Sequence, residues 1–477
     1  MLNRTLWQDE AMLALNIVGK NFAQLLLPLD QNQVAPVLYL YLVKFCSLLI
    51  PDSELGLRLV SFLAYVISLI YFQKLLKLLI HNQLIKLLLL TLFIFNQPLI
   101  FYSGEVKQYC CDVLVAVLLM YFTLKPAEQQ KHKYLILTCV GMLGILLSNI
   151  TVLLLFPIGF YLLIHDYKRN HILSLKQVFS IIFSWVLVFA VYYLAFIHNH
   201  PSKEFMVSYW NSKGFMPTNP FSGAFYGFLF EAFNEIFCYI NLVPFYENVI
   251  FIEVLCLLTL GVVSLFKQKQ MGLMAILLVP ILLNLILSAV SIYPFHSRLI
   301  IYIYPLIILL IGVGLDWLTT RFSLTKLKLY TMVICGQSLL IIGLYFIKLQ
   351  HPYAQKDLKG AIKYVNKKIQ AGEKVFVYYE AIPSFKYYQK IGVVSPELPV
   401  ILDTVNVINT PKTNNVAGYD KLVSELNGDY WFLFMGVRNR EKEFYLLNRL
   451  KEAGYEKLDS NISKGASAFR MKYSTDI

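Results

Sequence analysis

Residues 55–73 read LGLRLVSFLAYVISLIYFQ, and this stretch decides the fold. A helix of about 20 mostly apolar residues is long enough to cross the hydrocarbon core of a bilayer. The whole chain has the same character, because 57% of its residues are hydrophobic, 15% are charged and its mean hydropathy is +0.59. These values exclude a soluble globular protein and predict a polytopic α-helical membrane protein.

Further apolar stretches of about 17 to 25 residues bring the predicted number of transmembrane helices to about ten. They lie near 55–73, 86–102, 108–124, 134–149, 150–165, 178–197, 247–266, 271–292, 299–318 and 328–348. Another apolar stretch, 37–50, is only marginally long enough to cross, carries Lys44, and would invert every later loop if it did. We therefore expect 37–50 to form an interfacial helix.

The formal charge of +13 is spread over the loops. Basic residues in a membrane protein set its orientation, so we expect no nucleic-acid partner. The cation-rich loops, expected in the cytoplasm, carry Lys74, Lys77 and Lys86; Lys125, Lys131 and Lys133; Lys168, Arg169 and Lys176; Lys267 and Lys269; and Arg321, Lys326 and Lys328. The alternate loops carry only Lys107, Lys203, Lys213 and Arg298. This pattern predicts that the N-terminal residues and the C-terminal tail are extracytoplasmic, in a periplasm, at a cell surface or in an organelle lumen. Of these settings, we expect a bacterial plasma membrane.

The tail has a different composition from the rest of the chain. Residues 355–371 and 441–453 have the period of a helix, while 374–379, 430–435 and 466–473 read as strands. A small water-soluble α/β domain is therefore predicted. The expected organisation is an acidic-motif loop with the interfacial helix over 1–54, a transmembrane domain over 55–349 and the extracytoplasmic α/β domain over 350–477.

Two acidic motifs lie at the membrane edge. The first acidic edge is residues 6–11, with Asp9 and Glu10, and the second acidic edge is residues 102–109, with Glu105. The loop charges place both edges in one compartment, and two such edges outline an active site. Glu105, Gln108, Tyr109 and Asp112 are spaced to share one helix face. Asp112, below the membrane surface, should face a wet cavity or a cationic partner.

Four motifs carry a resemblance to a known family. They are Trp7-x-Asp9-Glu10-Ala11, Leu29-Asp30-x-Asn32-Gln33-Val34-Ala35-Pro36, Ser53-Glu54-Leu55-x-Leu57-Arg58-Leu59 and Tyr102-Ser103-x-Glu105-Val106-Lys107-x-Tyr109. Their order and spacing resemble GT-C glycosyltransferases of the protein O-mannosyltransferase type, and the stretch from His296 to Tyr302 resembles a later Arg-containing motif. The sequence departs from the family at Gln33, where His or Lys is usual.

The resemblance implies an integral membrane enzyme that passes a sugar from a polyprenyl phosphate, usually with inversion, to an extracytoplasmic acceptor: protein, lipid or glycan. The family places one transmembrane helix ahead of the Asp-Glu motif, and none precedes Asp9 here. We expect either a start upstream of Met1 or an unusual topology.

The chemistry itself accounts for these residue types. Attack on an anomeric carbon passes through an oxocarbenium-like state, and an acceptor hydroxyl is a poor nucleophile until a base removes its proton. We expect Asp9 to be that base and Glu105 to orient the acceptor or the donor sugar. Supporting positions are Glu10, Gln33, Tyr109 and Asp112. A phosphate leaving group needs cations, and the outward-facing candidates are Arg58, Lys107 and Arg298.

Simpler interpretations stand beside these. Asp9 and Glu10 are also typical first-turn acids of a helix, and Arg58 and Arg298 are typical anchors at the end of a span. No histidine pair has metal-binding spacing, so no cofactor is expected with certainty, although carboxylates and phosphate together suit a divalent metal. The alternative functions are a transporter or lipid flippase, whose charges would line a path near the midplane, and a non-catalytic scaffold.

Overall fold

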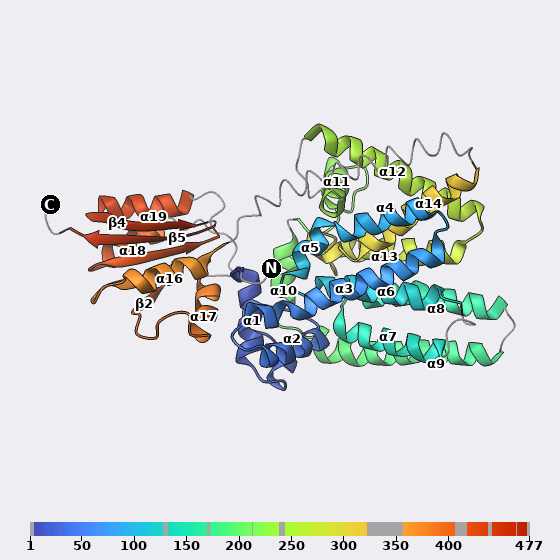
Figure 1. Ribbon diagram of the computed structural model, residues 1–477, viewed down its shortest axis with the longest axis horizontal. Coiled ribbons are helices and arrows are strands. Elements are labelled where there is room, and N and C mark those ends of the chain that lie inside the picture. The colour runs from blue at the N-terminus through green and yellow to red at the C-terminus, as the bar shows by residue number, and fades with distance from the viewer. Residues whose placement is uncertain are drawn as a thin grey trace. The chain divides into compact units, whose positions relative to one another are not determined.

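The computed structural model (Figure 1) describes residues 4–126, 132–168, 172–211, 213–237, 244–321, 356–405, 417–436, 441–463 and 465–474. Two compact units emerge from the packing. The smaller unit comprises Met1–Gln33, Val43–Leu57 and Leu349–Ile477, and the larger unit comprises Val34–Leu42 and Arg58–Lys348. The predicted fold class is confirmed: apolar helices make up most of the chain, and a small sheet domain lies near the C-terminus.

The larger unit is a bundle of helices (Figure 1). They are α3 (Glu54–Leu79), α4 (Gln83–Ile94), α5 (Gln97–Ser103), α6 (Tyr109–Leu124), α7 (Lys133–Leu147), α8 (Thr151–Lys168), α9 (Ile172–Tyr192), α10 (Lys203–Asn211), α11 (Gly223–Phe237), α12 (Pro244–Lys267), α13 (Met271–Ala289) and α14 (Ile303–Arg321). The closest pairs are α12 with α14, α7 with α9, and α8 with α13. Segments far apart in the chain therefore pack as neighbours.

Small residues allow the closest of these approaches. Gly261 of α12 and Gly314 of α14 face each other, and a Cβ added to Gly314 would lie 2.7 Å from the backbone nitrogen of Gly261. Glycine is common where two membrane helices cross, because it lets their backbones come close. The pairing of α12 with α14 thus depends on these two positions.

Within the described residues, four helices are long and apolar enough to cross a membrane: Glu54–Leu79, Leu175–Ile197, Met271–Ala289 and Ile303–Arg321. The pair α4 and α5 makes a fifth if it counts as one span. The helices α6, α7 and α8 coincide with predicted spans but are shorter in their apolar part. The predicted number of about ten spans is therefore not confirmed, and the predicted span 328–348 lies outside the described residues.

The predicted span 86–102 is not one straight helix, because α4 and α5 meet at a bend of 46°. Asn96 causes the break: its side chain accepts a hydrogen bond from the N–H of Leu99 (3.0 Å) and caps a new helix. The carbonyls exposed at the end of α4 find other donors, since Tyr65 bonds to Ile94 (2.6 Å) and Tyr304 to Leu92 (2.9 Å). Backbone groups at membrane depth need such partners.

In the smaller unit, five strands form one sheet in the order β2-β1-β3-β5-β4. They are β1 (Lys374–Val377), β2 (Val400–Leu402), β3 (Tyr430–Met435), β4 (Tyr455–Ser463) and β5 (Ala466–Tyr473). β1 runs parallel to β2 and β3, while β5 is antiparallel to both β3 and β4. All of β3 is buried, as expected of a central strand covered on both faces.

Helices cover both faces of this sheet. On one face, α18 (Ala417–Glu425) and α19 (Glu441–Glu452) pack over an aromatic core that includes Phe376 and Phe432. On the other face lies α16 (Leu358–Lys368), whose Tyr364 ring is 6.0 Å from the ring of Trp431. The predicted α/β domain is therefore confirmed, and it also contains α17 (Ile382–Lys390).

The smaller unit also contains the N-terminal helix α1 (Gln8–Gly19), which packs against α17 of the C-terminal domain. A short helical turn, η1 (Gln24–Leu26), follows it. The stretch predicted to be an interfacial helix forms α2 (Val37–Leu49), so its helical state is confirmed. Its place in the membrane interface stays a prediction.

Candidate functional site

The predicted site residues are divided between the two units. The smaller unit holds Asp9, Glu10 and Gln33, and the larger unit holds Arg58, Glu105, Lys107, Tyr109, Asp112 and Arg298. Each unit arranges its own members. The expectation that Asp9 and Glu105 share one site stays a prediction.

At the first acidic edge, Asp9 and Glu10 occupy the first turn of α1. The Glu10 side chain is fully buried, accepts a hydrogen bond from the N–H of Trp7 (3.4 Å) and lies 3.9 Å from Arg4. A carboxylate in this position stabilises the start of a helix. Glu10 therefore has a structural role, which leaves Asp9, half-buried on the same turn, as the better candidate for a base.

The loop after α1 folds back along that helix. The side chain of Asn16 accepts a hydrogen bond from the N–H of Asp30 (2.8 Å) and donates one to its carbonyl (3.2 Å). Gln33 follows in this loop and is buried. Its amide donates to the sulfur of Met12 (3.5 Å), and Met12 lies three residues after Asp9 on α1. The structure thus brings Gln33 to the first turns of α1, and its supporting role stays a prediction.

At the second acidic edge, the chain is not helical. α5 ends at Ser103 and α6 begins at Tyr109, so Glu105 and Lys107 lie in the turn between two helices. The prediction that Glu105 and Gln108 share a helix face with Asp112 was therefore wrong. The reason is local: Gln108 is the N-cap of α6, and its carbonyl accepts the first hydrogen bond of that helix, from the N–H of Asp112 (3.1 Å).

This turn is buried and fixed to α3. The side chains of Glu105 and Lys107 are 1% and 6% exposed, and the carbonyl of Lys107 accepts a hydrogen bond from the hydroxyl of Ser61 (2.8 Å). Ser61 lies three residues after Arg58 on α3, and positions three apart on a helix are neighbours. Two of the three predicted cations, Arg58 and Lys107, are therefore positioned by adjoining elements.

The third predicted cation also approaches the second acidic edge. Arg298 lies in the short helix η4 (Ser297–Ile300), and its guanidinium is 5.7 Å from the ring centre of Tyr109. An arginine over a tyrosine ring is held by cation–π attraction. Arg298 and Tyr109 thus meet at the start of α6.

Asp112 lies one turn further along α6 and is buried. Its carboxylate lies within electrostatic range of Tyr293, which is partly buried, and of the buried Tyr302. Tyr302 in turn accepts a hydrogen bond from the amide of Asn284 on α13 (2.9 Å). Asp112 is therefore part of a polar cluster inside the bundle, where an isolated charge would be costly.

A basic and aromatic cluster lies beside Arg298. The ring of His296 is 5.7 Å from that of Trp210, and the ammonium of Lys213 lies 5.6 Å from the Trp210 ring. Burial, together with the positive charges of Lys213 and Arg298, lowers the pKa of His296 to about 4. His296 is therefore neutral at pH 7, so the positive charge comes from Lys213 and Arg298. This surrounding favours an anion.

Glu54, the first residue of α3, is a buried carboxylate to which sequence reasoning gave no role. One of its oxygens accepts hydrogen bonds from the ammonium of Lys359 (2.8 Å) and the hydroxyl of Tyr388 (3.0 Å). These partners are 305 and 334 residues away in the sequence. No local pattern could have connected them.

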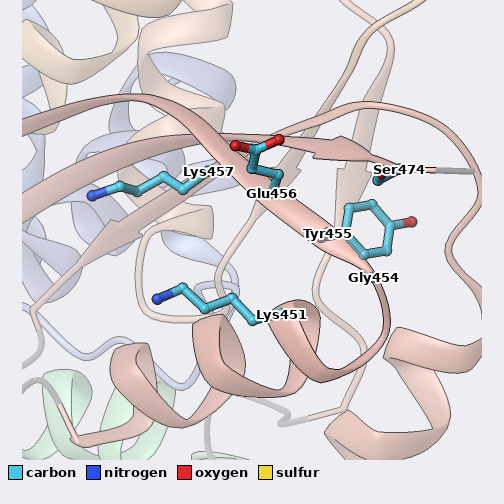
Figure 2. A pocket seen from close by; sticks show the side chains of 6 residues that line it. All are labelled: Lys451, Gly454, Tyr455, Glu456, Lys457 and Ser474. Atoms are coloured by element: carbon cyan, nitrogen blue, oxygen red, sulfur yellow. The ribbon is translucent and has the colours of Figure 1, made fainter. Parts of the chain in front are cut away.

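No group of three or more metal-binding side chains gathers among the residues that the structure describes. The C-terminal domain has one shallow, open hollow, shown in Figure 2. It is lined by Lys451, Gly454, Tyr455, Glu456, Lys457 and Ser474, at the end of α19 and the start of β4. None of the predicted site residues contributes to it.

Comparisons with known proteins match the membrane region. Residues 34–196 match the model of a family described as dolichyl-phosphate-mannose-protein mannosyltransferase, which confirms the predicted resemblance over that stretch. No curated protein matches the chain.

Two similar solved structures are those of ArnT from Cupriavidus metallidurans. The structure bound to undecaprenyl phosphate has 10% identity and a TM-score of 0.47, covering 98% of this chain and 94% of that one. The apo structure has 11% identity and a TM-score of 0.44, with the same coverage.

Proposed function

We propose that this protein is a membrane glycosyltransferase that moves a sugar from a polyprenyl phosphate to a hydroxyl of an extracytoplasmic acceptor. The observation that carries the proposal is the match of residues 34–196 to a mannosyltransferase family, because that stretch contains Arg58, Glu105 and Lys107. The packing of the Glu105–Lys107 turn against α3 supports it. No observation among the described residues favours the transporter alternative.

Asp9 acts as the general base in this mechanism. It takes the proton from the acceptor hydroxyl as that oxygen attacks the anomeric carbon and the bond to the phosphate oxygen breaks. A single displacement of this kind inverts the anomeric configuration. The structural role of Glu10 as a buried helix cap supports this choice between the two acids.

Glu105 orients the acceptor or the donor sugar, while the cations stabilise the leaving phosphate. The negative charge on the phosphate grows as the sugar departs, and preorganised positive charges lower the barrier to such a step. Arg58 binds phosphate oxygens with a planar fork of donors, whereas Lys107 acts as a point charge. Arg298, held over Tyr109, is the third ligand in this proposal.

The site faces the outside of a plasma membrane, bacterial in type. The loop charges support this orientation, because cations accumulate in the loops on the cytoplasmic side. The same orientation makes the α/β domain of residues 350–477 extracytoplasmic, together with the acidic-motif loop of residues 1–54. The apolar helices of the larger unit support an integral membrane protein.

The experiment is a transfer assay with the full chain reconstituted in lipid. Polyprenyl-phosphate-linked hexoses and pentoses are offered with a membrane extract as acceptor, and release of polyprenyl phosphate is measured together with the labelled product. We expect transfer by the wild type and none by Asp9→Asn at an unchanged unfolding temperature.

The matched control is Asp30→Asn, an exposed aspartate paired with Lys20 in the same unit, which should keep its activity. Full activity of Asp9→Asn would reject the mechanism. Failure of every lipid-linked sugar to react with the wild type would reject the function.

A further inference from the structure

We propose that the C-terminal α/β domain positions the first acidic edge for catalysis, through the hydroxyl of Tyr388, which joins the backbone of Leu6 to the buried carboxylate of Glu54. This inference rests on the proposed function. It assigns Tyr388 as a positioning residue, 379 positions along the chain from the base it serves, and gives the C-terminal domain a part in the reaction.

The backbone of Leu6 is held on both sides by α17. Its N–H donates to the hydroxyl of Tyr388 (3.0 Å), and its carbonyl accepts a hydrogen bond from the hydroxyl of Ser384 (2.7 Å). Leu6, Ser384 and Tyr388 are all fully buried. Leu6 lies three residues before Asp9, so these two bonds fix the point from which α1 starts.

The residues on either side of Leu6 also contact the C-terminal domain. The hydroxyl of Thr5 donates to Asp357 (3.3 Å) and accepts from the N–H of Lys359 (3.3 Å) at the start of α16. The ammonium of Lys356 lies 5.3 Å from the ring of Trp7. Three consecutive residues, Thr5 to Trp7, are thus bound by α17 and by the residues at the start of α16.

The same tyrosine hydroxyl reaches a second segment. Having one proton, it donates that proton to Glu54 (3.0 Å) while its oxygen accepts from Leu6. Burial and the nearby carboxylate of Glu54 raise the pKa of Tyr388, so the hydroxyl keeps its proton at any working pH. The ammonium of Lys359 bonds to the same carboxylate oxygen (2.8 Å) and neutralises it.

The two segments joined here both lead to proposed site residues. Leu6 precedes Asp9, the proposed base, and Glu54 lies one helical turn before Arg58, a proposed phosphate ligand on the same helix α3. A hydroxyl that ties the starts of both helices together sets the position of each. Errors of about 1 Å in such positions can cost about 100-fold in rate.

Tyr388→Phe is the sharpest test, because it removes one oxygen and keeps the ring. Lys359 still neutralises Glu54 in this variant, so the fold should persist. In the full reconstituted chain we expect kcat to fall about 10- to 100-fold, with KM for the lipid-linked sugar unchanged within about twofold. Ser384→Ala should lower kcat in the same direction, and it decides the question if Tyr388→Phe fails to fold.

The matched control is Tyr364→Phe. Its hydroxyl also bonds to a carboxylate in the same domain, that of Asp459 (3.0 Å), but it lies on α16 and its hydrogen bond does not reach the N-terminal segment. Its kcat should equal that of the wild type. If losing a tyrosine–carboxylate hydrogen bond had only a general structural effect, kcat would fall equally in Tyr388→Phe and Tyr364→Phe.

Hydrogen exchange supplies a readout that does not depend on activity. Peptides covering residues 4–14 should exchange faster in Tyr388→Phe and Ser384→Ala than in the wild type and Tyr364→Phe. The proposal is overturned by unchanged exchange there, by a kcat within twofold of the wild type in both variants, or by an equal loss in Tyr364→Phe. Absence of transfer by the wild type would instead remove the proposed function. The exchange result would still decide whether Tyr388 and Ser384 hold the N-terminal segment in place.

Discussion

The two acidic edges contain the same kinds of residues but are built in different ways. The first edge begins a helix, and the backbone of its first residue, Leu6, is bound by side chains from a domain more than 300 residues away. The second edge is a turn between α5 and α6, and a hydroxyl of the neighbouring helix α3 holds its backbone. The first edge therefore depends on a distant part of the chain, and the second on adjacent membrane helices.

This difference predicts how the two acids of the first edge respond to neutralisation. Asp9→Asn should lower kcat by about 100- to 10,000-fold, the usual contribution of a general base. Glu10→Gln should lower it less than about tenfold, because the amide oxygen can still cap α1. Transfer assays at saturating lipid-linked sugar measure both. Equal losses would show that Asp9 and Glu10 do not differ in role, contrary to their assignment as base and helix cap.

At the second edge, the largest effect is expected from the cation on α3. Arg58→Met should reduce kcat/KM by about 10- to 100-fold, because hydrogen bonds to a charged group contribute about 1.5–3 kcal/mol. Arg58→Lys should recover part of the loss, since it restores the charge without the planar fork. Steady-state kinetics with the polyprenyl-phosphate sugar check this. An Arg58→Met enzyme with unchanged kcat/KM would remove Arg58 from the site.

A smaller effect should follow from a change at the break between α4 and α5, which precedes the second acidic edge. Asn96→Ala removes the cap of α5 and should cost about 1 kcal/mol of stability together with a few-fold loss of kcat. Asn82→Ala, which removes the cap of α4 at its other end, should cost similar stability and leave kcat unchanged. Thermal unfolding and transfer rates of the two variants separate these effects. Identical kcat values would show that the break has no part in presenting the edge.

The smallest effect concerns pH and His296. Its pKa of about 4 in the folded chain lies below the value of about 6.5 expected when unfolded. The unfolded chain therefore binds the proton more readily, so this group's contribution to stability is complete above about pH 6.5 and is lost as the pH falls toward 4. As the pH falls from about 6.5 to about 4, the unfolding temperature should fall more steeply for the wild type than for His296→Gln. Parallel curves would contradict the assignment.

The C-terminal domain was predictable wherever its strands are buried. β3 and β5 begin and end where the sequence pattern places them, and β3 is a continuous apolar run of the kind that marks a buried strand. β4 was missed, since five of the seven residues from Glu456 to Ile462 are polar or charged and the strand lies at an edge of the sheet. β2 was missed because it has only three residues.

The site was predictable as residue types but not as geometry. The acids and cations stand out at the membrane edge because charges there are costly. The helical spacing of Glu105 and Asp112 was misleading, because the chain turns between α5 and α6 before it becomes helical again. The contacts of Leu6 and Glu54 with Tyr388 join residues more than 300 positions apart, which no local pattern records.

We propose that the two acidic edges serve one extracytoplasmic site. Cross-linking tests it most directly: Asp9→Cys and Glu105→Cys are introduced together into a chain whose seven native cysteines are replaced. A short, membrane-impermeant bifunctional thiol reagent is then added from the outer side of oriented vesicles. The account predicts an intramolecular cross-link that forms more slowly when a polyprenyl-phosphate sugar is bound. Labelling of the two cysteines from opposite sides of the membrane, or no cross-link with both accessible, would contradict it.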